Sequence, residues 1–99
     1  MTVPITVFGK PFCQGCMLTT KRLERHGLPF EYRDITTDPE AFAKVTALGY
    51  REAPVVVVGD MHWGGFRLAK LDRLGEIHAG CPDVVVLDAA ARAYLEGAA

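Results

Sequence analysis

The chain has 99 residues, of which 49% are hydrophobic and 23% are charged, and its formal net charge is −1. A chain of this length and composition folds as one globular domain around a single core. The near-neutral net charge gives no long-range field that would attract nucleic acid or an anionic membrane, so we expect neither partner.

The first residues and the cysteine content bear on the compartment. Residues 1–4 lack the basic segment and the long apolar segment of a signal peptide, and no apolar run approaches the roughly 20 residues of a membrane span. The odd number of cysteines, 3, argues against a secreted disulfide framework. We therefore expect a cytoplasmic protein, in which a cysteine pair is catalytic or metal-binding rather than structural.

The first half of the chain alternates between strand and helix patterns. Val3 to Phe8 is a short apolar run that predicts a buried strand, and a helix pattern follows from about Cys13 to His26. Residues 30–35 alternate in polarity and predict a strand with one solvent-facing side. Asp38-Pro39-Glu40 is typical of a helix N-terminus, and Gly49 ends that helix. The apolar stripe of the first helix contains Met17, Thr20 and Leu23, and Gly27 is its expected C-cap. The stripe of the second helix contains Phe42, Val45 and Leu48.

The second half of the chain begins with a valine run. Val55 to Val58 predicts a strand buried on both faces, and Met61 to Trp63 returns as its antiparallel partner after a turn at Gly59-Asp60. A third helix carries Leu68, Leu71, Leu74 and Ile77 and is stopped by Gly80 and Pro82. Residues 83–96 add a short helix, with Val84, Leu87, Ala91 and Leu95 facing inward.

The order of these elements, β-α-β-α-β-β-α, defines an α/β fold. It predicts a four-stranded mixed sheet that is flanked by helices on both faces. We assign residues 1–80 to this domain and residues 81–99 to a C-terminal extension, which packs on the same domain as a short helix.

Cys13-Gln14-Gly15-Cys16 is the motif that decides the function. It stands between the first strand and the first helix, where a C-x-x-C is typical of a thioredoxin-like redox pair. The thiolate is the reactive form of cysteine, and a helix N-terminus favours it. We therefore expect Cys13, on the exposed lip of the helix, to attack a disulfide, and Cys16, one turn further on, to resolve the mixed disulfide. Lys10 is either a further stabiliser of the Cys13 thiolate or a plain loop cation.

Four short motifs of the chain carry a resemblance to a known family: Lys10-Pro11-x-Cys13-x-x-Cys16, Ala47-Leu48-Gly49-Tyr50, Ala53-Pro54-Val55-Val56-Val57 and His62-Trp63-Gly64-Gly65-Phe66-Arg67. With them the chain resembles the NrdH-redoxins over residues 6–74. This resemblance implies a thioredoxin fold, no bound cofactor, and an electron donor for class Ib ribonucleotide reductase in deoxyribonucleotide synthesis. It also implies that thioredoxin reductase with NADPH, rather than glutathione, reduces the protein.

The resemblance implies further site residues. Pro54 would follow a cis peptide bond, which leaves the Ala53 backbone free to pair with an extended substrate segment. The stretch Trp63, Gly64, Gly65, Phe66 and Arg67 would shape the partner surface where glutathione otherwise sits, with Trp63 and Phe66 also open to an interpretation as core aromatics. The acidic pair that holds glutathione in other glutaredoxins is missing here, so we expect weak glutathione dependence. The chain departs from the family pattern at Gln14-Gly15 and at Leu68-Ala69, where the family usually has Pro-Asp.

Other functions remain open at this stage. A glutathione-dependent glutaredoxin would carry the same C-x-x-C, and so would a redox-sensing module without turnover. A zinc or iron–sulfur protein could use Cys13 and Cys16 together with His78-x-x-Cys81, although a metal-bound Cys13 could not attack a disulfide. We expect no metal, a monomer, a spare thiol at Cys81, and surface positions for His26, His62 and His78.

Overall fold

The protein alternates strands and helices around one sheet. The computed structural model describes residues 4–80 and 89–98. The elements are β1 (Ile5–Gly9), α1 (Gln14–Arg25), β2 (Glu31–Asp34), α2 (Pro39–Ala47), β3 (Val55–Val58), β4 (Met61–Gly64), α3 (Leu68–Gly80) and α4 (Ala89–Glu96). Within the described residues the predicted strands and helices are thus confirmed, with boundaries that differ by a few residues, while the expected starts of the first strand at Val3 and of the last helix at Asp83 lie outside them.

The sheet has the strand order β2-β1-β3-β4. β1 pairs with β2 in parallel and with β3 antiparallel, and β3 pairs antiparallel with β4. The four-stranded mixed sheet is therefore confirmed. Its register aligns Val7 with Val56 and Val56 with Trp63, so these three side chains form one row on one face of the sheet.

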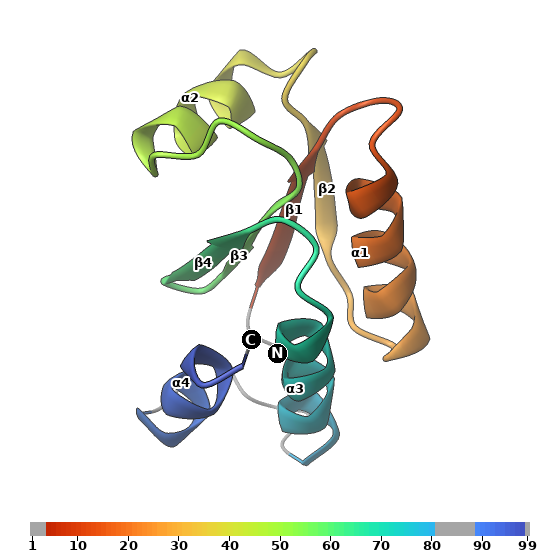
Figure 1. Cartoon of the computed structure of the whole chain (residues 1–99), viewed down its shortest axis with the longest axis vertical. Coiled ribbons are helices and arrows are strands. Elements are labelled where there is room, and N and C mark those ends of the chain that lie inside the picture. The colour runs from red at the N-terminus through yellow and green to blue at the C-terminus, as the bar shows by residue number, and fades with distance from the viewer. Residues whose placement is uncertain (1–3, 81–88, 99) are drawn as a thin grey trace.

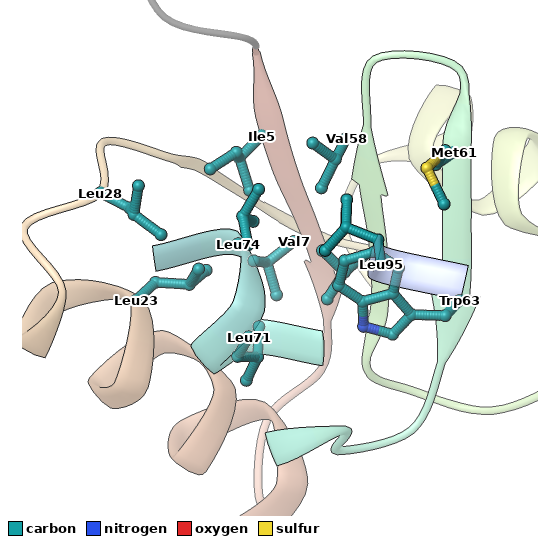
Figure 2. Packing of buried hydrophobic residues seen from close by; sticks show 11 residues of the cluster. Ile5, Val7, Leu23, Leu28, Val58, Met61, Trp63, Leu71, Leu74 and Leu95 are labelled. Atoms are coloured by element: carbon teal, nitrogen blue, oxygen red, sulfur yellow. The ribbon is translucent and has the colours of Figure 1, made fainter. Parts of the chain in front are cut away.

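Helices cover both faces of the sheet, but unequally. The larger core cluster lies between the sheet and α1, α3 and α4, and Figure 2 shows its side chains converging from these elements. The smaller cluster joins Phe8 and Val55 to Ala41 and Val45 of α2. Figure 1 shows α3 beside α1, and α2 well away from both. Since β3 contributes Val56 and Val58 to one cluster and Val55 to the other, the expected burial of this strand on both faces is confirmed.

Local signals explain where the helices begin and end. The Asp38 carboxylate accepts hydrogen bonds from the backbone of Glu40 and Ala41, both at 3.1 Å, and so caps α2 as expected. After α1, Gly27 adopts a φ of 69°, a conformation that glycine reaches without a steric penalty. It follows the C-cap residue His26 rather than being the C-cap itself.

Two of the predicted helix stripes are confirmed at Leu23 and Val45 but wrong at their first residues. The buried residues of α1 are Cys16, Thr19 and Leu23, whereas Met17 is exposed. In α2 the buried residues are Ala41 and Val45, whereas Phe42 is exposed. Successive residues of a helix point about 100° apart, so neighbours in the sequence face different sides. The small residues Cys16 and Ala41 therefore face inward, and the larger Met17 and Phe42 that follow them face solvent.

The C-terminal helix α4 is part of the core. Leu95 is fully buried in the larger cluster, between α3 and β4 (Figure 2). Lys70 donates a hydrogen bond to the Leu95 carbonyl at 2.9 Å, and Arg73 donates one to the Tyr94 carbonyl at 2.7 Å. The inward positions expected of Ala91 and Leu95 are confirmed, while Pro82, Val84 and Leu87 lie outside the described residues.

Candidate redox site

Cys13 and Cys16 are joined by a disulfide at the N-terminus of α1. Cys13 is the N-cap residue and Cys16 lies in the first turn, so the helix brings their Cα atoms to 5.2 Å. The backbone N–H of Cys16 donates to the Cys13 sulfur at 3.2 Å. In the reduced protein this donor and the helix dipole are expected to favour a thiolate at Cys13.

The two sulfurs differ in exposure less than expected. Cys13 is 9% exposed and Cys16 is 2% exposed. The order is the predicted one, but the expectation that Cys13 stands on an exposed lip is corrected, because the disulfide leaves only its edge open to solvent. A partner must therefore approach Cys13 along a groove.

A groove of about 380 Å³ runs along this edge, on the β2 side of α1. Cys13 and Cys16 line it together with Lys10, Phe12 and Tyr32, among others. Phe12 is fully exposed at a φ of 57°, and it directly precedes Cys13. Phe12 and Tyr32 were missed in the sequence. An exposed aromatic residue directly before the C-x-x-C was the available signal for Phe12, whereas Tyr32 reaches the groove only through the pairing of β2 with β1.

The loop before β3 lies against the disulfide. The Ala53–Pro54 peptide bond is cis, as the resemblance implied. The Ala53 carbonyl oxygen lies 3.8 Å from the Cys13 sulfur. A Cβ atom at Gly15 would lie 3.2 Å from Pro54 Cδ, so the glycine in the C-x-x-C lets this loop approach closely. The structure thus brings Ala53 and Pro54 to the cysteine pair.

The segment after β4 supports the same loop. The backbone N–H of Gly65, at a φ of 82°, donates to the Pro54 carbonyl at 2.8 Å. Gly64 packs under the Tyr50 ring, where a Cβ atom would lie 2.9 Å from the nearest ring carbon. Phe66 and Arg67 are exposed next to this support, and Arg67 donates a hydrogen bond to the Gly64 carbonyl at 3.2 Å.

Trp63 belongs to the core. It is only 5% exposed and packs in the larger cluster (Figure 2), so the interpretation of Trp63 as a core aromatic is confirmed and its assignment to the partner surface is corrected. The physical reason is the period of two in β4, because Trp63 shares the inward face with Met61. Lys70 lies 5.7 Å from the centre of its ring.

The remaining candidate residues take different positions. Lys10 is exposed and lines the groove beside the disulfide, so its role in favouring the thiolate stays a prediction. His62 is exposed but shares a hydrogen bond with the Tyr50 hydroxyl at 2.7 Å. His26 is half-buried between α1 and α3, and His78 is half-buried too, so the expected surface positions of these two histidines are corrected. Cys81 lies outside the described residues.

An ion cluster links α1 to α3 below the site. Asp72 accepts hydrogen bonds from Arg22 at 2.7 and 3.0 Å, and its Oδ1 lies 2.7 Å from His26 Nε2. The hydrogen bonds from Arg22 and then from His26 lower the pKa of the Asp72 carboxyl to about 2. The His26 ring lies over Gly75, where a Cβ atom would be 2.4 Å from His26 Nδ1. This cluster therefore fixes how the two helices pack.

The described residues contain neither a membrane-spanning helix nor a cluster of metal ligands. None of the helices within residues 4–80 and 89–98 is long and apolar enough to cross a membrane. In the same residues, no group of three or more His, Cys, Asp or Glu side chains comes together as a metal site. His78 has its proposed partner Cys81 outside this part of the chain.

A thioredoxin-type sheet with a C-x-x-C at the first helix and a cis-proline loop beside it defines a thiol–disulfide oxidoreductase. The glutaredoxin family model matches residues 5–63. The chain is 37% identical over 70 residues to the glutaredoxin-like protein NrdH of Escherichia coli K12, covering 71% of this chain and 86% of that protein. It is 36% identical to NrdH of Lactococcus lactis IL1403, covering 71% and 97%.

Solved structures agree with these matches. The structure of the glutaredoxin-like protein NrdH-redoxin from Escherichia coli, described as having a thioredoxin-like activity profile, superimposes with a TM-score of 0.68 at 37% identity, over 72% of this chain and 93% of that one. The chain therefore belongs to the glutaredoxin family, and the resemblance to the NrdH-redoxins is confirmed. The predicted thioredoxin fold is confirmed with it.

Proposed function

We propose that this protein carries electrons in the cytoplasm from thioredoxin reductase and NADPH to the disulfide of a class Ib ribonucleotide reductase. The observation that carries the proposal is the open edge of the Cys13–Cys16 disulfide, with the Ala53 carbonyl 3.8 Å from the Cys13 sulfur. A partner segment that pairs with this backbone would bring its own sulfur to Cys13.

The exchange proceeds in two displacements. The Cys13 thiolate attacks one sulfur of the partner disulfide, whose S–S bond breaks as the other partner sulfur leaves as a thiolate. Cys16 then loses its proton and attacks the Cys13 sulfur, so the second partner thiolate leaves and the Cys13–Cys16 disulfide forms. Two electrons have passed to the partner, and NADPH restores them through thioredoxin reductase.

The loop after β4 supports thioredoxin reductase over glutathione as the source of electrons. Arg67 and Leu68 stand at the two positions where the Gly-Gly-x-Asp-Asp pattern of glutathione-binding glutaredoxins has the acidic pair that holds the glutathione amine. Both side chains are exposed beside Gly65 and the Pro54 loop. A cation and an aliphatic side chain offer no carboxylate to that amine, so we infer weak glutathione dependence. Lys10, near the sulfurs in the adjacent groove, would favour the attacking thiolate.

A reconstituted electron-transfer chain tests the proposal. NADPH consumption is measured with thioredoxin reductase, this protein and the oxidised large subunit of a class Ib ribonucleotide reductase, with Cys13→Ser as the control. We expect consumption that depends on both proteins and is lost in the variant. Efficient turnover with glutathione and glutathione reductase, and none with thioredoxin reductase, would instead assign a glutathione-dependent glutaredoxin. One metal ion per chain in the purified protein would favour the metal-binding alternative.

A further inference from the structure

A second groove lies on the other side of α1 from the one that borders Lys10 and Tyr32. It has a volume of about 310 Å³ and is lined by Leu18, Lys21, Arg22, Arg25, Phe66 and Leu68. It adjoins the redox site, because Phe66 Cβ would lie 3.8 Å from a Cβ atom at Gly15, inside the C-x-x-C. A partner segment that leaves the sulfurs in this direction crosses Phe66 and enters the groove.

The floor of this second groove is apolar. Leu18 comes from α1, Phe66 from the loop after β4, and Leu68 is the first residue of α3. Their exposed fractions are 40%, 37% and 44%, respectively. Large apolar side chains gathered in one exposed concavity and rimmed by charge are typical of an interaction site. The floor therefore fits an apolar side chain of a partner.

The rim of this second groove is basic. Lys21, Arg22 and Arg25 follow Leu18 at spacings that place all four on one face of α1. Arg22 is held by Asp72, whereas neither Lys21 nor Arg25 has an ion-pair partner in the described part of the chain. Both are exposed. The rim thus offers two uncompensated cations in a protein whose net charge is only −1.

The neighbouring elements leave this positive charge in place. α3 begins at Leu68 with no acidic residue in its first turn, so the positive end of its dipole stands at the groove. Glu24 of α1 lines the groove on the opposite side of the helix. A carboxylate of a partner would therefore find complementary charge at Lys21, at Arg25 and at the start of α3.

We propose that this second groove binds an acidic segment of the disulfide partner, in which Asp or Glu side chains flank an apolar residue close to the redox cysteines. The inference rests on the proposed function, since it names the partner's chemistry beside the sulfurs. Nucleic acid fits the groove less well, because its backbone would place phosphates over an apolar floor.

Paired disulfide peptides test the proposal. One peptide carries an intramolecular Cys-Ser-Ser-Cys disulfide next to Leu-Glu-Asp-Glu, and its match carries Leu-Gln-Asn-Gln, with each extension placed on either side of the cysteines. Single-turnover reduction by the reduced protein at low salt is expected to be about fivefold faster for the acidic peptide in at least one placement. The ratio should fall to about one in the double variant Lys21→Gln/Arg25→Gln and stay unchanged in Lys44→Gln, which removes an exposed cation from α2.

Two further arms separate the groove from the chemistry. Reduction of hydroxyethyl disulfide, which is small and neutral, should proceed at equal rates in all three proteins. Binding of the fluorescently labelled acidic peptide to a Cys13→Ser/Cys16→Ser protein should weaken about fivefold when Lys21 and Arg25 are also replaced. Equal rates for both peptides, or a preference that survives the double variant, would overturn the groove proposal alone. Displacement of the peptide by a single-stranded oligonucleotide at equal charge would overturn it in favour of nucleic acid. If no disulfide is reduced, the proposed function fails, and the binding arm still decides the groove.

Discussion

The redox end of this protein and the end that carries α4 are held together by different kinds of contact. At the redox end, backbone groups and glycines decide the geometry, as in the bonds from Cys16 to the Cys13 sulfur and from Gly65 to Pro54. At the far end (Figure 1), side chains decide it: Leu95 fills the core, while Lys70 and Arg73 hold the α4 carbonyls. Chemistry and stability should therefore be separable by substitution.

Loss of the nucleophile should have the largest effect. Cys13→Ser is expected to lower disulfide reductase activity by at least about a thousandfold, because the hydroxyl is not ionised at neutral pH. Stability of the variant should match that of the reduced wild-type protein within about 0.5 kcal/mol. Insulin reduction and urea unfolding measure the two quantities. A variant that keeps a tenth of the activity would remove Cys13 from the nucleophile's role.

The far end should show the opposite behaviour. Leu95→Ala is expected to lower the free energy of unfolding by about 3 kcal/mol, because it leaves a cavity under α4. Activity at a temperature where the variant stays folded should change by less than about twofold, since Leu95 does not reach the site. Phe42→Ala, an exposed large apolar residue on α2, is the control and should cost less than about 1 kcal/mol. A loss of activity that, expressed as a free energy, equals the loss of stability would contradict the separation of the two ends.

Two glycines with similar positive φ angles sharpen the comparison. Gly65 and Gly27 have φ values of 82° and 69°, and a Cβ atom at either would meet nothing within 4 Å. Alanine should therefore cost about 1–2 kcal/mol of stability at both positions. Only Gly65→Ala should also lower activity, by about threefold or more, because it shifts the bond to Pro54 beside the sulfurs. Equal activities in the two variants would show that the Gly65 loop does not contribute to the activity of the site.

The smallest expected effect concerns the helix pair that carries the site. The pKa of Asp72 is lowered to about 2, from a usual value of 3.8, so its ionised form stabilises the fold. This stabilisation is complete above about pH 4 and is lost as the pH falls towards 2. Asp72→Asn should cost about 1 kcal/mol at pH 7, after allowance for solvent screening, and the gap to wild type should close in that acid range. Urea unfolding from pH 7 to pH 2 checks this, and a gap independent of pH would contradict it.

The contrast between the two ends also explains what the sequence could predict. The C-x-x-C, the Asp38 cap and the glycine turn after α1 depend on particular residue types at fixed short spacings, so local patterns predicted them. The positions of Leu95 and Ala91 were predicted as inward-facing, but the hydrogen bonds from Lys70 and Arg73 to α4 join segments more than 20 residues apart, which no local pattern reveals. The family model, matched over residues 5–63, covers much of the redox end and stops before α4.

Two features of the candidate site were predicted only in part, and for different reasons. Trp63 was placed on the partner surface from the motif around it, although the alternation Met61, His62, Trp63 already favours an inward ring. The basic face of α1, with Leu18, Lys21 and Arg25, is visible in the sequence as helical spacing. Its meeting with Phe66 and Leu68 depends on how α3 packs, and only the tertiary structure supplies that.

The measurement that tests the central claim most directly is the alkylation of the two thiols in the reduced protein as a function of pH. Iodoacetamide labelling, resolved by mass spectrometry of the peptides, gives a separate rate for Cys13 and for Cys16. We predict that Cys13 is already labelled rapidly at neutral pH, because its thiolate forms at a lower pH than that of an ordinary thiol. Cys16 is expected to stay protected. Faster labelling of Cys16, or equal rates that follow an unperturbed thiol, would contradict Cys13 as the attacking sulfur.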